Sequence, residues 1–149
     1  MPEFHPLMKD LLKFMQISPS RLAANEVYSF TIDGKTEVSF LQQQPGSLDM
    51  LVHAATLANP KADGVLRSLL EMNLFASAGP NISVGMNPKT GAISLWSRMS
   101  LADADVPALV KLIEFAVQRA STIRNALQVQ PVRPVSGARR ASMRFAFPV

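Results

Sequence analysis

The chain of 149 residues has no cysteine, two histidines, one tryptophan and one tyrosine. Without cysteine it forms no disulfide and offers no thiol nucleophile, and His5 and His53 alone do not make the ligand cluster of a structural zinc. The absence of cysteine agrees with a reducing compartment. A chain of this length buries roughly 70% of its unfolded surface, so a hydrophobic core is sufficient for folding. We expect neither a metal nor another cofactor.

Long hydrophobic runs are absent as well. No segment approaches the roughly 18 apolar residues of a membrane-spanning helix. The first residues, Met1-Pro-Glu-Phe-His-Pro6, lack the basic segment and apolar run of a cleaved export signal. With 48% hydrophobic and 17% charged residues, the composition is typical of one globular domain. We therefore expect no membrane insertion.

The excess of positive charge is confined to one end of the chain. Of the 15 Lys and Arg residues, four lie in residues 128–149, which contain no acid, and the other 11 balance the 11 acids of residues 1–127. We therefore divide the chain into a neutral domain, 1–127, and a basic, proline-containing C-terminal tail, 128–149. Because the domain is neutral, we do not expect it to bind nucleic acid.

The tail admits several interpretations. Pro131-Val-Arg-Pro134 has the minimal PxxP spacing, and Arg139-Arg-Ala-Ser142 matches a basic-directed phosphorylation pattern. The four arginines can also contact nucleic-acid phosphates. A solvated linker explains the same composition, as does an extension that folds over the domain, anchored by Phe145 and Phe147 in a strand-like segment.

Hydrophobic spacing predicts the elements of the first half of the chain. Apolar residues recur at helical spacing from Phe4 to Ile17 and predict a first helix. Alternating segments at 27–32 and 36–41 flank Asp33-Gly34 and predict a hairpin. The apolar run 48–57 predicts a third strand, although its period alone also permits a helix.

The second half repeats these signals in a different order. Asn59-Pro60 combines a capping side chain with proline at the first helical position and predicts a helix start. Segments 81–86 and 92–97 predict a second hairpin, and Ser100–Asp103 resembles a capping box that opens a long helix to Leu127. The fold class is therefore α+β with an antiparallel sheet, in the order α-β-β-β-α-β-β-α.

The helices and strands carry more apolar side chains than one small core accommodates. Leu7 and Phe14 lie beyond the edge of the first helix's apolar stripe, and Leu112 and Phe115 lie off the stripe of the last helix. Trp96 faces away from the apolar side of its strand. Exposed apolar side chains mark a binding surface, or else a dimer interface covers them all.

No arrangement of catalytic side chains stands out. His5 lies near the start of the chain, His53 lies inside an apolar strand without a nearby acid, and the carboxylates are scattered. Gly79, Gly85 and Gly91 are six residues apart but lack the lysine that follows a phosphate-binding loop. We therefore expect no catalytic residue and no enzymatic activity.

Three ordered segments precede the long helix: Leu69-Leu-Glu-Met-Asn-Leu-Phe75, the hairpin Ile82–Leu95 with its Asn-Pro-Lys-Thr-Gly turn, and Arg98-Met-Ser-Leu101. In this order they resemble the class I type III secretion chaperones, the CesT-like or Tir chaperone family. The resemblance extends over about residues 4–127. It implies a homodimer in the bacterial cytoplasm.

The resemblance also implies a function in protein transport linked to virulence. Such a chaperone binds the N-terminal chaperone-binding segment of a secreted effector protein in extended form and keeps it competent for secretion, without nucleotide hydrolysis. An extended segment adds backbone hydrogen bonds at a sheet edge and places apolar side chains in grooves. The surplus of apolar side chains agrees with this mode of binding.

Two sets of residues follow from the resemblance. The middle helix and the adjacent strand of the family form the dimer, which implies an interface containing Val65, Leu66, Leu69, Ile82 and Val84. The first helix and the outer sheet surfaces bind the effector, which implies contacts from Leu7, Phe14, Val27, Leu41 and Trp96. The alternative is that the effector-binding set completes the core.

The chain departs from the family pattern in two respects. Family members are typically acidic, whereas residues 1–127 are neutral, and the arginine-rich tail extends beyond the usual end of the fold. The alternative function is therefore a nucleic-acid-binding regulatory protein that acts through the tail.

Overall fold

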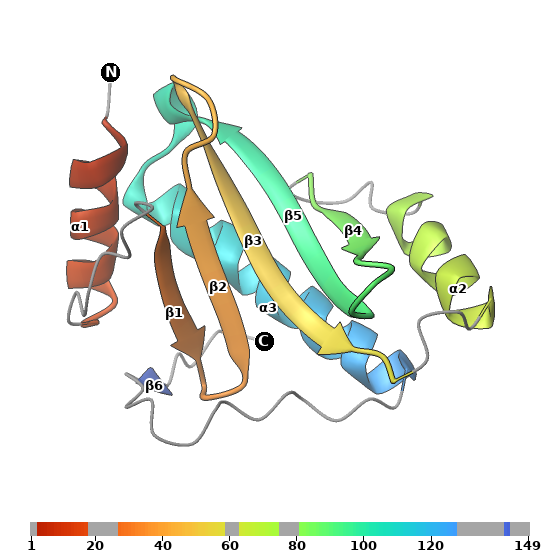
Figure 1. Cartoon of the computed structure of the whole chain (residues 1–149). Helices are drawn as coiled ribbons and strands as arrows, with labels where there is room; N and C mark the ends of the chain where they lie inside the picture. The colour runs from red at the N-terminus through yellow and green to blue at the C-terminus, as the bar shows by residue number, and fades with distance from the viewer. Residues whose placement is uncertain (1–2, 18–26, 59–62, 75–80, 128–141, 144–149) are drawn as a thin grey trace.

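The computed structural model of the chain describes residues 3–17, 27–58, 63–74, 81–127 and 142–143. Its elements follow the predicted order, with a short strand added in the tail (Figure 1), and the α+β class is confirmed. The elements are α1 (Phe4–Phe14), β1 (Tyr28–Ile32), β2 (Thr36–Leu41), β3 (Ser47–Thr56), α2 (Asp63–Leu74), β4 (Ser83–Met86), β5 (Ala92–Ser100), the 3-10 turn η1 (Leu101–Asp103), α3 (Val106–Leu127) and β6 (Ser142–Met143).

The strands form one sheet in the order β4-β5-β3-β2-β1-β6. Neighbours among β1 to β5 are antiparallel, as predicted. The added strand β6 runs parallel to β1 and pairs Ser142 with Thr31 and Met143 with Ile32. Phe145 and Phe147, the anchors considered for such a strand, lie outside the described residues.

The sheet has one covered face and one open face. In Figure 1, α3 crosses behind the sheet, α1 lies beside β1, and α2 lies beside β4. Alternate side chains of the strands are buried in the core on the covered face: Tyr28, Phe30, Ile32, Val38, Phe40, Met50, Val52, Ile93 and Leu95. The side chains between them lie on the open face.

Helix α1 ends in a Schellman motif, three residues before the predicted end. Gln16 has a left-handed φ of 56°, and its N–H donates to the carbonyl of Lys13 at 3.1 Å. The N–H of Ile17 donates to the carbonyl of Leu12 at 2.9 Å. These two bonds satisfy carbonyls that the last turn of a helix leaves open, and the buried side chain of Ile17 completes the motif.

The prediction that Leu7 lies outside the core is wrong, because its side chain is only 7% exposed. Helix α1 packs against α3 and also against β1, where Phe4 meets Tyr28 edge-on at 5.6 Å and His5 Nδ1 lies 2.8 Å from Tyr28 Oη. Two faces of α1 are therefore covered, whereas the stripe argument allowed for one. Helix α3 likewise contacts both the sheet and α1, and Leu112 is buried as well.

The first hairpin turns at Asp33 and Gly34, as predicted. Both residues have positive φ, 52° and 67°, and the N–H of Lys35 donates to the carbonyl of Ile32 at 3.0 Å. A β-turn with positive φ at both central residues matches the twist of the flanking strands. The local sequence was sufficient to specify this turn.

The long helix starts later than predicted. The hydroxyl of Ser100 accepts from the N–H of Ala102 at 3.3 Å and caps η1. The carboxylate of Asp105 then accepts from the N–H of Ala108 at 2.8 Å and caps α3. The sequence pattern placed one helix start where the structure has two.

Helix α2 is attached to the outer strand β4 by a side-chain amide. Asn73 Nδ2 donates to the carbonyl of Val84 at 3.0 Å, and the N–H of Val84 donates to Asn73 Oδ1 at 2.7 Å. The amide thus satisfies both polar groups of a residue in an edge strand. The predicted helix start at Asn59-Pro60 lies outside the described residues, which resume at Asp63.

Candidate functional site

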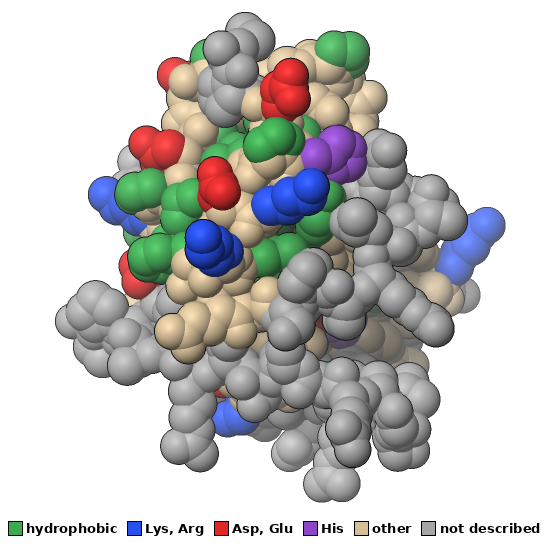
Figure 2. All heavy atoms as spheres, turned by 90° about the vertical axis from the view of Figure 1, so that its left-hand side faces the viewer, with side chains coloured by type: hydrophobic (Ala, Val, Ile, Leu, Met, Phe, Trp, Pro, Cys, Tyr) green, Lys and Arg blue, Asp and Glu red, His purple; other side chains and the backbone are tan. Residues whose placement is uncertain are grey.

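A groove lies between the end of α1 and the first turns of α3. Its volume is about 560 Å³, and its lining is mostly apolar: Phe14, Val106, Pro107, Val110, Lys111 and Glu114. Figure 2 views the molecule from this side and shows hydrophobic side chains interleaved with acidic and basic ones. Phe14 is 60% exposed. The groove therefore offers a place for an apolar side chain between one positive and one negative charge.

A second apolar surface lies on the open face of the sheet. Leu51 and Trp96 are opposite each other on β3 and β5 and are 42% and 40% exposed. Leu41 lies on the same face, since it pairs with Asp49, two residues before Leu51. We call the surface formed by Leu41, Leu51 and Trp96 the open-face patch.

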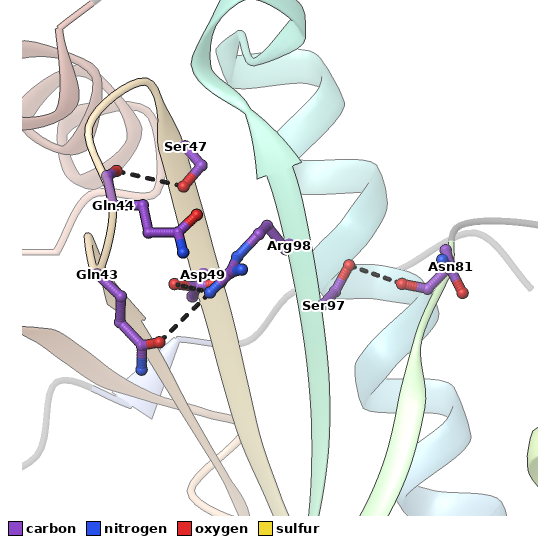
Figure 3. A network of polar contacts seen from close by, with 7 residues as sticks. All are labelled: Gln43, Gln44, Ser47, Asp49, Asn81, Ser97 and Arg98. Carbon is purple, nitrogen blue, oxygen red and sulfur yellow. Dashed lines mark hydrogen bonds and ion pairs between the residues drawn. The ribbon is translucent and has the colours of Figure 1, made fainter.

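A polar network borders the open-face patch (Figure 3). Arg98 Nε donates to Asp49 Oδ1 at 2.7 Å, and Arg98 Nη2 donates to Asp49 Oδ2 at 3.4 Å and to Gln43 Oε1 at 3.3 Å. The hydrogen bond to Asp49 raises the pKa of the Arg98 guanidinium. The guanidinium carbon lies 5.3 Å from the centroid of the Trp96 ring, so the cation restrains an otherwise exposed indole.

The five residues predicted to bind an effector do not form one site. Phe14 lines the α1–α3 groove, whereas Leu41 and Trp96 lie on the open-face patch. Val27 is half-buried just before β1, and Leu7 belongs to the core. Leu51 was missed, because its strand reads as a continuous apolar run in which alternation cannot be recognised.

The residues predicted to form a dimer interface differ in how far the single chain buries them. Leu69, Ile82 and Val84 are buried within the single chain, while Val65 and Leu66 are half-buried. The side chains that α2 exposes are Leu70 at 69% and Leu74 at 75%, which were missed. Their signal in the sequence is the spacing of Leu66, Leu70 and Leu74, one helical turn apart.

A smaller hollow of about 340 Å³ lies beside α3. Its lining comes from α2 and α3: Met72, Phe115, Gln118, Arg119, Thr122 and Ile123. Arg119 Nη1 is the one buried side-chain nitrogen or oxygen without a hydrogen-bond partner in the described part of the chain. A buried donor left in this state costs free energy.

Among the described residues, no three His, Asp and Glu side chains are placed to hold a metal ion, and no helix has the length and hydrophobicity to cross a membrane. His53 Nε2 lies 3.0 Å from Thr56 Oγ1. Burial lowers the pKa of His53, with Glu37 opposing the shift and Arg124 adding to it.

The family model of the Tir chaperone protein (CesT) family matches residues 6–124. The chain belongs to this family. The match covers both apolar surfaces described above and ends before the tail. The resemblance read from the three ordered segments is thereby confirmed.

Solved structures with the fold of this CesT-family chain include chains of three complexes. A chain of the ExsC–ExsE complex matches with a TM-score of 0.68 and 14% identity, covering 89% of this chain and 94% of that one. A chain of the complex of the Yersinia pestis type III secretion chaperone SycH with a fragment of YscM2 matches at 0.64 and 19%, covering 79% and 97%. A chain of the HopA1–SchA chaperone–effector complex matches at 0.63 and 14%, covering 80% and 91%. No curated protein sequence matches the chain.

Proposed function

We propose that the chain is a type III secretion chaperone that binds the N-terminal segment of an effector protein in extended form and keeps it competent for secretion. The observation that carries this proposal is the exposed Phe14 in an apolar groove on a CesT-family fold. Similar chains occur in complexes of a chaperone with an effector and of SycH with YscM2. A partner protein of the same kind fits the surfaces of this chain.

The positions of the two apolar surfaces support an extended ligand. The α1–α3 groove and the open-face patch belong to different elements, and α1 lies beside the β1 edge while the patch lies on the sheet. One extended segment advances about 3.3–3.6 Å per residue, so it can place side chains on surfaces that belong to different elements. It also places alternate apolar side chains at intervals along its course.

We further propose that the chaperone is a homodimer through α2. Leu66, Leu70 and Leu74 form a row along this helix, and Leu70 and Leu74 are largely exposed. An exposed apolar row on a helix is suited to pairing with a second copy of itself around a two-fold axis. Val65, from the predicted interface set, adjoins this row.

We infer that the chaperone acts by binding alone, in the bacterial cytoplasm. The family is a chaperone family, and both candidate surfaces are apolar with a few charged side chains at their borders. Such surfaces supply affinity through burial of apolar area. Holding a ligand of this kind requires no chemical step.

Co-expression with the secreted effectors of the source bacterium tests the proposal. The wild-type chain should recover at least one effector, and Phe14→Ser should weaken binding. Because burial of a phenylalanine side chain contributes about 1.5–3 kcal/mol, we expect a loss of about tenfold or more in affinity. Phe14→Leu, which keeps the position apolar, should retain most of the binding.

The same experiment can contradict the proposal. A stable monomeric chain that recovers none of the effectors would overturn it. If Phe14→Ser recovers an effector as strongly as Phe14→Leu does, the groove does not bind the effector. Circular dichroism of both variants, compared with wild type, separates loss of binding from loss of folding.

A further inference from the structure

The two edges of the sheet are covered in different ways. An edge strand exposes unpaired backbone groups that readily pair with another strand. At the β4 edge, the amide of Asn73 satisfies both backbone groups of Val84, at 2.7 and 3.0 Å. Both partners belong to ordered elements of the domain. An incoming strand therefore has to displace a side chain of α2 to pair at this position.

The β1 edge is covered by the tail of the chain itself. Strand β6 consists of two residues, Ser142 and Met143, and lies parallel to β1 next to Thr31 and Ile32. Strand β1 has five residues, so this pairing occupies its C-terminal end. The pairing joins residues more than one hundred positions apart in the sequence. Strand β6 lies outside the segment 6–124 that the family model matches, whereas β1 lies within it.

We propose that the segment containing Ser142 and Met143 is a resident strand that competes with an extended polypeptide for the edge of β1. The proposal rests on the proposed function, because the polypeptide it competes with is the effector segment. A peptide that adds to this edge takes the position beside Thr31 and Ile32 that β6 now occupies. The tail and the effector therefore exclude each other at this end of the strand.

The short length of β6 makes such an exchange feasible. Each backbone hydrogen bond contributes little net free energy, since it replaces bonds to water. A two-residue strand forms few of them, whereas an effector segment that follows all of β1 forms more and adds side-chain burial. The resident strand thus covers the edge of β1 in the free chaperone, and a longer extended ligand displaces it.

The charges near this edge favour the tail over an uncharged segment. Arg139, Arg140 and Arg144 flank the paired residues in the sequence. On the domain, Asp33 follows the end of β1 and Glu37 lies opposite Thr31 on β2, and these two acids outnumber the single base of the turn, Lys35. Opposite charges on the two partners strengthen association at low ionic strength. Added salt should therefore weaken the hold of the tail.

Hydrogen exchange on the full chain tests the resident strand. Ser142→Pro with Met143→Pro removes both backbone N–H groups of β6, whereas Ser142→Ala with Met143→Ala keeps them. We expect at least one amide of residues 31–32 to exchange ten or more times faster in the proline variant and at the wild-type rate in the alanine variant. Equal exchange in all three proteins would overturn the proposal.

A tail peptide supplied in trans tests the competition without any effector. A labelled peptide of residues 138–149 should bind the full-length proline variant at least tenfold more tightly than wild type, in which the edge is occupied. The same peptide with prolines at 142 and 143 has equal charge and should not bind. Equal binding of both peptides, or equal binding by both proteins, would contradict a strand-edge competition.

Effector binding and tail-peptide binding test different proposals and can be distinguished. If the tail peptide binds as expected and no effector is recovered in co-expression, the resident strand stands and the chaperone function fails. If an effector is recovered, the proline variant should bind it more tightly than the alanine variant. Equal affinity of the two variants for that effector would show that the tail does not compete.

Discussion

Arg124 Nη1, in the last turn of α3, donates a buried hydrogen bond of 3.0 Å to the backbone carbonyl of Ala54 in β3. The register of β3 with β5 shifts between His53 and Ala55, so Ala54 lies at a bulge. Arg124 Nη2 also donates to Thr36 Oγ1 at 3.1 Å. The guanidinium therefore joins α3 to two strands, and burial lowers its pKa.

Replacing this arginine tests how much the bulge depends on it. Arg124→Met keeps most of the apolar stem but leaves the carbonyl of Ala54 and the hydroxyl of Thr36 without this donor. A buried polar group without a partner costs about 1–3 kcal/mol, so we expect the free energy of unfolding to fall by about that amount. Urea denaturation measures the change. Thr36→Val, which removes one of the two bonds, should cost less, and an unchanged stability of Arg124→Met would refute the interpretation.

The ion pair of Asp49 and Arg98 should affect both the stability of the sheet and the fluorescence of Trp96. Asp49 is fully buried. Asp49→Asn removes its charge and replaces one carboxylate oxygen, which accepts a hydrogen bond from Arg98, with an N–H₂ group that can only donate. We expect a lower urea midpoint and a shift in fluorescence, since Trp96 is the single tryptophan and its ring lies beneath Arg98. Gln43→Ala, which removes only the 3.3 Å contact, is the control. It should leave both signals close to wild type.

His53 should make stability depend on pH below neutrality. Its folded-state pKa lies below the ordinary value of 6.5, mainly because burial disfavours the charged ring. As the pH falls below 6.5, the unfolded chain binds the proton first, so the free energy of unfolding decreases until the folded-state pKa is passed. Urea midpoints at pH 7.5 and 5.5 should therefore fall further for wild type than for His53→Gln. An equal fall in both proteins would contradict this assignment.

The exposed leucines of α2 should control the oligomeric state. Light scattering of the wild type should give twice the chain mass of 16.2 kDa, and Leu70→Glu with Leu74→Glu should give a monomer. Because both side chains are exposed in the single chain, these substitutions should change monomer stability by only about 0.5 kcal/mol each. Gln42→Glu, at an exposed position before β3, should remain dimeric. A dimeric double variant would show that α2 is not the interface.

Gly91 should be the least replaceable of the described glycines. It has a φ of +77°, and a Cβ added there would lie 2.5 Å from the carbonyl oxygen of Leu57. The N–H of Leu57 also donates to the carbonyl of Gly91 at 2.9 Å, which fixes the two segments together. Gly91→Ala should therefore cost about 1–3 kcal/mol of folding free energy. Gly85→Ala, where a Cβ meets nothing within 4 Å, is the matched control in thermal or urea denaturation.

The features that could be predicted from the sequence are those that short segments encode. Asp33-Gly34 specified the first hairpin because positive φ at two successive positions is a local property. The alternation of Tyr28, Phe30 and Ile32 specified which side of β1 is buried. Phe14 and Trp96 were placed on the surface by the same periodicity, since each lies off the apolar face of its own element.

The burial of several residues depends on contacts between distant segments. Leu7 was expected on the surface and is buried, because α1 is covered by both α3 and β1. Leu69, Ile82 and Val84 were assigned to a dimer interface and lie in the core of the single chain. A hydrophobic pattern states that a side chain avoids water, but it does not state which partner covers it.

The sequence by itself determined the order of the helices and of β1 to β5, the turn of the first hairpin, the excess of positive charge in residues 128–149, and the family. Periodicity and turn chemistry act over a few residues, so they can be read along the chain. Only the tertiary structure decided that Arg124 completes the bulge at Ala54, that Leu70 and Leu74 remain exposed, and that the tail pairs with β1. These outcomes depend on packing between segments far apart in the sequence, which no local pattern encodes.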